Sequence, residues 1–185
     1  MQAAGGTAIA EPCTPRPGRR LPALAFALGA GGFLADLAAK TAALALLDPA
    51  HPPVLLGGLL TLQLVRNPGA AFSLGENFTV VLACIALIAF VFVAGWLIPR
   101  VRHVGWAVAE GFLLAGVTGN LADRLFREPG PFHGHVVDFI QLPSFAIFNV
   151  ADMFITAAAV LIVWFVAVAQ IGPDGRSQRA QPATS

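Results

Sequence analysis

The sequence contains few charged residues and few cysteines. Charged residues make up 11% of the 185 residues, and the formal net charge is +1. Nucleic-acid binding requires a concentrated basic surface, so this composition gives no indication of a nucleic-acid partner. The two cysteines, Cys13 and Cys84, lie in a polar tail and within an apolar run. We therefore predict no disulfide bond between them.

The chain also lacks the short motifs of the common hydrolases. It contains no His-Glu-x-x-His zinc motif, no Gly-x-Ser-x-Gly motif, and no serine or cysteine paired with a histidine at an evident site. No internal repeat is visible, which counts against a transporter built from two inverted halves. These absences disfavour zinc, serine and cysteine protease chemistry.

Apolar residues, in contrast, are abundant. They make up 57% of the chain, and the mean hydropathy is +0.75. A soluble domain of this size could not bury so much apolar surface, so we predict an all-α integral membrane protein. About 20 apolar residues cross the hydrocarbon core of a bilayer. Four stretches are long enough to do so, namely residues 21–47, 78–98, 104–122 and 148–169.

The positions of the arginines predict the orientation of these segments. Seven arginines lie before the first segment, between the second and third, and after the fourth, whereas the other two connections hold three. The side of a membrane protein that is richer in Lys and Arg faces the cytoplasm. We therefore expect both termini in the cytoplasm and the loops 48–77 and 123–147 outside.

The two ends of the chain differ in composition from the middle. Residues 1–20 and 172–185 are polar or rich in small residues and lack apolar periodicity, so we predict two flexible cytoplasmic tails. Between them, residues 21–171 form the membrane domain. The first apolar run is too long for a secretory signal peptide, and it contains Asp36 and Lys40.

The first outer loop has features of its own. Residues 60–64 alternate between apolar and polar, as a half-buried strand does, and Asn-Pro-Gly at 67–69 is typical of a turn. We expect a small extracytoplasmic β element between the first and second membrane helices. The small and apolar residues 70–75 would either cover the helix ends or let a substrate backbone approach closely.

Several polar residues lie within or beside the membrane segments. Asp36 and Lys40 are four apart and share a helix face, so we interpret them as an ion pair that makes both tolerable in the bilayer. Asn120, Asp123 and Arg124 lie together at the outer end of the third segment. They would either bind a neighbouring strand or substrate, or satisfy the last carbonyls of their own helix.

Two further aspartates indicate the chemistry. Asn149 and Asp152 share a face at the outer start of the fourth segment, where Asp152 could also cap the helix. Asp138 lies in the apolar stretch 136–140, where a carboxylate has no packing benefit. Two carboxylates that meet do not both ionise readily, so one can activate water while the other polarises a carbonyl. Asp138 and Asp152 are therefore a candidate pair for cutting a peptide bond at the membrane surface, although their spacing alone does not bring them together.

Four motifs together resemble those of bacterial lipoprotein signal peptidase, also called signal peptidase II. They are NPGAAFSLG at 67–75, GNLADR at 119–124, VVDF at 136–139 and FNVAD at 148–152. The resemblance extends from about Asp36 to Ile155. It implies an aspartic endopeptidase of the bacterial inner membrane that cuts diacylglyceryl-modified prolipoproteins on the N-terminal side of the lipidated cysteine. It also implies a monomer in contact with membrane lipid, with no cofactor or metal ion, that globomycin-type cyclic peptides block.

The resemblance assigns roles to individual residues. It places the catalytic dyad on Asp138 and Asp152. The chain departs from the commoner pattern at Leu37, at Ala122 and in the lengthened stretch 127–135, which would shape the outer edge of the cleft. Roles in substrate binding or in support of the site are implied for Asp36, Lys40, Asn67, Asn120, Asp123, Arg124 and Asn149.

Two alternatives use other residues. His133, His135 and Asp138 could bind zinc, a possibility that sensitivity to chelators would test. A small channel or proton-coupled carrier could line a polar path with Asp36, Lys40, Glu110 and Asp152. Against the channel, most carboxylates gather at the outer surface, and only Glu110 lies toward the cytoplasmic half.

Overall fold

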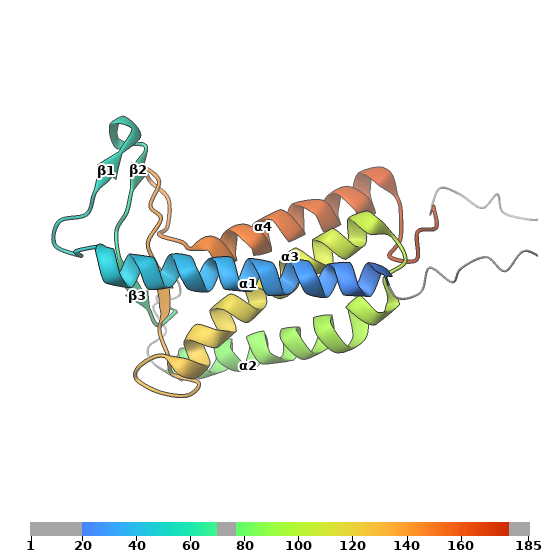
Figure 1. Ribbon diagram of the computed structural model, residues 1–185, viewed down its shortest axis with the longest axis horizontal. Helices are drawn as coiled ribbons and strands as arrows, with labels where there is room; N and C mark the ends of the chain where they lie inside the picture. Colours follow the sequence, from blue (N-terminus) through green and yellow to red (C-terminus); the bar gives the residue numbers. More distant parts are fainter. Residues whose placement is uncertain (1–19, 70–76, 178–185) are drawn as a thin grey trace, which may run out of the picture.

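The computed structural model describes residues 20–69 and 77–177 (Figure 1). Within them, four helices are long and apolar enough to cross a membrane, which confirms the predicted multi-pass architecture. The spans agree with the predicted segments to within a few residues, except that the third helix continues one turn further. The spans are Arg20–Leu46, Phe78–Arg100, Val104–Phe126 and Val150–Ala169.

Two of the spans change helical type near one end. Helix α1 (Arg20–Leu46) and helix α3 (Val104–Phe126) are α-helical throughout. Helix α2 (Asn77–Phe92) is extended by a π-helical stretch and a 3₁₀ turn that end at Arg100. Helix α4 (Val150–Val163) is extended by the π-helical stretch Trp164–Ala169.

Helix α3 lies at the centre of the bundle, and Figure 1 shows it crossing behind α1. Of its most apolar window, 61% is buried, against 11–22% for the other three helices. Small residues permit this packing, because a side chain on Gly111 would come within 2.8 Å of the Ala25 carbonyl of α1. One on Gly116 would overlap the Ala151 carbonyl of α4. Close backbone approach at small residues is typical of membrane helix packing.

In the described residues, four short strands form two antiparallel pairs. Strand β1 (Val54–Leu55) pairs with β2 (Leu60–Thr61), and β3 (Val65–Asn67) pairs with β4 (Val136–Asp138). In the second pair Val65 lies opposite Asp138. The expected β element is therefore present, but it is divided at residues 62–64 and its last strand comes from the connection between α3 and α4.

The β strands all lie at one end of the bundle, as Figure 1 shows. Helices α1 and α3 end there, and α2 and α4 begin there, so both long connections meet at this end. At the opposite end the chain after α4 turns back, and the Arg102 N–H donates to the Pro173 carbonyl at 2.8 Å. Cys84 is exposed on α2, whereas Cys13, residues 70–75 and most of the two expected tails lie outside the described residues.

Candidate active site

Asp138 is the last residue of β4, and it is 3% exposed. The amide Nδ2 of Asn67, on the paired strand β3, donates to Asp138 Oδ2 at 2.9 Å, and Asn149 Nδ2 donates to Asp138 Oδ1 at 2.6 Å. Burial raises the pKa of the Asp138 carboxyl above its usual range, and the charge of Asp152 adds to this effect. The two amide hydrogen bonds act in the opposite direction without overcoming the burial.

Asp152 lies in the first turn of α4 and caps it, as the alternative interpretation of this residue expected. Asn149 Oδ1 accepts the Asp152 N–H at 3.0 Å, and Asp152 Oδ2 accepts the Asn149 N–H at 3.2 Å. This reciprocal arrangement is a capping box. The second carboxylate oxygen, Oδ1, accepts from Asn120 Nδ2 of α3 at 2.8 Å. The capping role therefore leaves one oxygen facing a side chain from another helix.

Asn149 connects the two aspartates. It is fully buried, and it hydrogen-bonds to Asp138 through its side chain and to Asp152 through its backbone N–H. Its Nδ2 also lies 3.2 Å from Asn120 Oδ1. A buried amide of this kind orients its neighbours because its donors and acceptors have fixed positions. The structure thus brings together Asn67, Asn120, Asp138, Asn149 and Asp152 from four different elements.

Arg124 has a mixed environment at the end of α3. Its Nη1 donates to the Asn120 carbonyl of its own helix at 3.1 Å, as one of the two interpretations expected. Its charge also interacts with Asp152, Asp123 and Asp138. Its Nε is buried and has no hydrogen-bond partner among the described residues. Arg124 therefore places its positive charge near the aspartates.

Asp36, Lys40 and Asp123 form a second polar cluster. Lys40 Nζ lies 2.8 Å from Asp36 Oδ2, which agrees with the predicted pair, and 2.7 Å from Asp123 Oδ2. Asp123 also forms an ion pair with Arg127. The sequence interpretation missed Arg127, although its spacing of four from Asp123 is typical of a helical ion pair.

Comparison with known proteins identifies the family. The family model described as signal peptidase (SPase) II matches residues 28–168, most of the chain. The chain belongs to the signal peptidase II family. The predicted family is therefore confirmed, and the protein is a membrane protease, a hydrolase.

Three proteins called lipoprotein signal peptidase illustrate the similarity. The one from Streptomyces coelicolor is 41% identical over 158 residues, covering 85% of this chain and 76% of the relative. That of Leifsonia xyli is 43% identical over 152 residues, covering 82% and 69%. That of Mycobacterium tuberculosis is 41% identical over 160 residues, covering 86% and 77%. None of these matches supports a channel or carrier.

Two solved structures share the fold. Both are described as structures of a bacterial membrane enzyme, at 1.9 and 2.3 Å resolution. The first has a TM-score of 0.69 at 22% identity and covers 79% of this chain and 94% of its own. The second has a TM-score of 0.65 at 23% identity and covers 88% and 95%. They show that the chain shares the helical fold of these two proteins.

The zinc alternative gains no support from the geometry of the described residues. The described residues contain no group of three or more His, Cys, Asp or Glu side chains placed to hold a metal ion. His133 is exposed, and its Nδ1 lies 3.1 Å from the Pro131 carbonyl. The described residues therefore do not assemble His133, His135 and Asp138, the ligands of this alternative, into a metal site.

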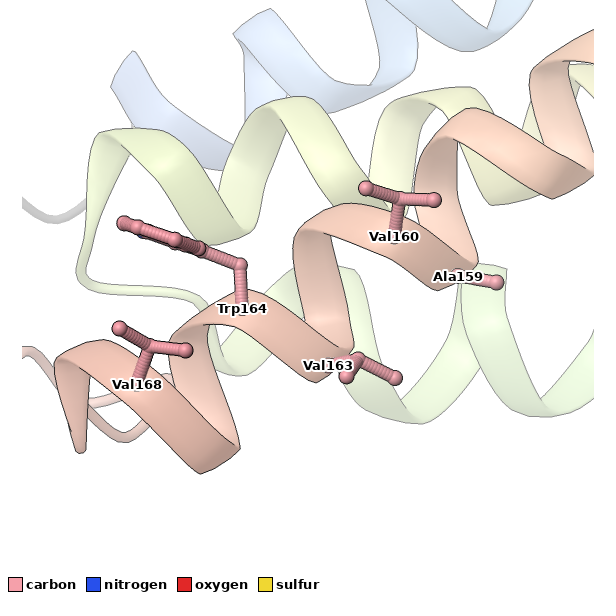
Figure 2. A pocket seen from close by; sticks show the side chains of 5 residues that line it. All are labelled: Ala159, Val160, Val163, Trp164 and Val168. Atoms are coloured by element: carbon pink, nitrogen blue, oxygen red, sulfur yellow. The ribbon is translucent and has the colours of Figure 1, made fainter.

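Two of the hollows in the described part of the chain lie along α4, and the first of them adjoins Asp152. The first has a volume of about 700 Å³, and Asp152 is part of its otherwise largely apolar wall. The second, of about 370 Å³, lies further along the helix, where Figure 2 shows only apolar and tryptophan side chains. The first hollow is lined by Leu142, Phe145, Ala146, Ile147, Phe148, Asp152, Met153, Thr156 and Ala157.

Proposed function

We propose that this protein is an aspartic endopeptidase that removes signal peptides from diacylglyceryl-modified prolipoproteins on the N-terminal side of the lipidated cysteine. Asp138 and Asp152 form its catalytic dyad. The observation that carries this proposal is the position of the buried Asn149, which hydrogen-bonds to both carboxylates beside an apolar hollow. The names of the relatives, lipoprotein signal peptidase, support the same substrate class.

The chemistry follows from two adjacent carboxyl groups that share a proton. The ionised carboxylate takes a proton from water, and the water oxygen attacks the scissile carbonyl. The protonated partner donates its proton to the carbonyl oxygen. When the C–N bond breaks, the carboxyl that took the water proton gives it to the leaving amine of the lipidated cysteine. The signal peptide gains a carboxyl end, and its hydroxyl returns a proton to the partner carboxylate. The dyad titrates as a coupled pair, so its two protonation steps belong to both residues.

The surrounding polar residues have supporting roles in this proposal. Asn67, Asn120 and Asn149 donate to the carboxylates and fix where their oxygens point. The positive charge of Arg124 lies near both carboxylates and would stabilise the negative charge that develops on the carbonyl oxygen. Asp36, Lys40 and Asp123 support the site and do not bind substrate.

The membrane positions the substrate. The hollow beside Asp152 has exposed apolar side chains such as Phe145 and Met153 in its wall, so an apolar peptide segment or acyl chain can enter it from the lipid. Because enzyme and substrate are anchored in the same bilayer, much less entropy is lost when the substrate is oriented at the site. We place the site at the outer face of the bacterial inner membrane, because the arginine-rich connections lie at the opposite end of the bundle.

Other expectations belong to the same proposal. The protein acts as a monomer without a cofactor, and globomycin-type cyclic peptides occupy the same cleft. Residues 21–171 form the catalytic domain between two cytoplasmic tails.

The proposal is tested by cleavage of a diacylglyceryl-modified precursor by the purified protein in lipid. Asp138→Asn and Asp152→Asn are expected to lower the rate by about 10²- to 10⁴-fold at matched folded yield. Asp48→Asn is the matched control, because Asp48 is a carboxylate of the first long connection that is 60% exposed. The Asp48→Asn variant should cleave the precursor at the rate of the wild type, with or without chelator. Near-normal cleavage by either dyad variant would show that the assignment is wrong.

A further inference from the structure

Lys40 contacts two carboxylates that lie outside the proposed dyad. Its Nζ lies 2.8 Å from Asp36 Oδ2 on α1 and 2.7 Å from Asp123 Oδ2 on α3. Lys40 and Asp36 are each 1% exposed, and Asp123 is 3% exposed. Breaking such a buried arrangement on one side is strongly destabilising, because a charge is left without its partner. The three residues therefore form a single bridge between α1 and α3.

Each of these carboxylates also accepts a backbone N–H. Asp36 Oδ1 accepts the N–H of Ala151 at 2.8 Å, and Asp123 Oδ2 accepts the N–H of Val137 at 3.2 Å. Ala151 is the residue before Asp152, and Val137 is the residue before Asp138. The two ends of the bridge thus hold the backbone immediately next to the two proposed catalytic residues.

From this arrangement we infer that Lys40 is a positioning residue, which sets the distance between the catalytic aspartates through Asp36 and Asp123. The inference rests on the proposed function, because it takes Asp138 and Asp152 as the dyad. Lys40 itself touches neither reacting carboxylate. It fixes α4 and β4 relative to each other, in addition to the direct hydrogen bond from Asn149 to Asp138.

Lys40 also acts on the side chain between the two sites. Its Nζ lies 3.3 Å from Asn120 Oδ1, and Asn120 Nδ2 donates to Asp152 Oδ1 at 2.8 Å. An ammonium group only donates, so it attracts the amide oxygen and turns the amide NH₂ group toward Asp152. The position of Asp152 is therefore coupled to Lys40 through its backbone neighbour and through its side-chain partner.

Arg127 completes the charge balance of the bridge. It pairs with Asp123 from the start of the lengthened stretch 127–135, so two carboxylates face two cations. The same stretch is held against the end of α3, because the Gly134 N–H donates to the Arg124 carbonyl at 3.1 Å. A side chain at Gly134 would overlap the carbonyls of Asp123 and Arg127. Arg127, the first residue of the lengthened stretch, thereby pairs with Oδ1 of Asp123, while Lys40 pairs with Oδ2.

A spectroscopic test is available because Lys40 is the one lysine in the sequence. Protein labelled with ¹⁵N at lysine Nζ should give one side-chain ammonium signal in nuclear magnetic resonance spectra. We expect Asp36→Asn, Asp123→Asn and Asp152→Asn each to shift this signal, the last through Asn120. Glu110→Gln is the matched control, a buried carboxyl on α3 outside the bridge, and should leave the signal in place. A spectrum of Asp152→Asn identical to the wild type would overturn the inference.

A kinetic test separates positioning from general stability. The triple variant Asp36→Asn, Lys40→Met and Asp123→Asn removes every charge of the bridge except Arg127 and keeps two side-chain oxygens that can accept the Ala151 and Val137 N–H groups. We expect kcat to fall on the order of 10²-fold, because displacement of catalytic groups by about 1 Å has effects of that size. KM should stay within about twofold of the wild type, since no substrate contact is removed.

The outcomes of the kinetic test distinguish the two proposals. A folded triple variant with the kcat of the wild type would overturn the role of Lys40 while leaving the dyad in place. Failure of the wild type to cleave would overturn the proposed function instead. If the triple variant does not fold, the shift of the lysine signal in Asp152→Asn decides, because that variant keeps the bridge intact.

Discussion

Asp36 and Glu110 are equally buried, each 1% exposed within a membrane span, yet their surroundings are opposite. Asp36 accepts a backbone N–H and pairs with Lys40. Neither carboxyl oxygen of Glu110 has a hydrogen-bond partner among the described residues. Burial alone therefore does not show that an acidic residue belongs to a functional site. The hydrogen-bond donors around the carboxylate are the better indicator, because buried polar groups with a structural role usually have hydrogen-bond partners.

The largest effect expected from this comparison is at Lys40. Lys40→Met leaves Asp36 and Asp123 buried with one cation fewer between them, and we expect the free energy of unfolding to fall by about 3–5 kcal/mol. Reversible unfolding in mixed detergent and lipid measures the change. A loss below about 1 kcal/mol would mean that the bridge behaves like an exposed ion pair, and the contrast with Glu110 would disappear.

The next effect concerns the space beside Asp36. A side chain at Gly119 would lie 2.5 Å from Asp36 Oδ2 and 3.0 Å from the Ala151 side chain. We expect Gly119→Ala to lower stability by about 1–3 kcal/mol through overpacking and to reduce cleavage. Gly31→Ala on α1 is the control, because nothing lies within 4 Å of its new methyl group. Equal effects of the two substitutions would contradict the tight packing at Gly119.

A smaller effect should appear in the pH dependence of stability. Burial raises the pKa of Asp138 in the folded state, so this carboxyl stabilises the fold when protonated. That contribution is complete below the unfolded pKa of about 4 and is lost as the pH rises through the folded value. Asp138→Asn should therefore gain stability relative to the wild type as the pH rises, by on the order of 1 kcal/mol.

Unfolding measured at several pH values for both proteins tests this expectation. A constant difference between Asp138→Asn and the wild type at every pH would show that the burial of Asp138 has no effect on its protonation.

The smallest effect is expected at Glu110. Glu110→Gln removes no ion pair and no donor that the structure places nearby, so stability should change by less than about 0.5 kcal/mol and cleavage should not change. The same unfolding and cleavage assays measure both quantities. A large loss of either would show that Glu110 has a partner and that the comparison with Asp36 is wrong.

Local patterns in the sequence predicted the parts of the fold that depend on near neighbours. Apolar runs long enough to cross a bilayer gave the four helices, and spacing by four predicted the pair Asp36 and Lys40. Pairing between distant segments has no such local pattern. Asn67 and Asp138 are 71 residues apart, and neither the pairing of their strands nor the contact of Lys40 with Asp123 could be deduced from periodicity.

The sequence predicted which residues gather in the candidate site, but it did not predict which of them hydrogen-bond to one another. Motif similarity singled out Asn67, Asn120, Asp138, Asn149 and Asp152 together, and the structure brings these five side chains into one hydrogen-bonded group. Their separate partners depend on how α3, α4 and β4 pack. The role of Asp152 as both cap and candidate catalyst illustrates this, since the sequence presented the two as alternatives and the structure accommodates both.

The capping box at the start of α4 has a consequence for control of proteolysis. One carboxylate oxygen of Asp152 holds the Asn149 N–H, so the first turn of the helix and the proposed catalytic group form together. A newly inserted or damaged copy whose α4 is frayed at this turn would have no assembled dyad.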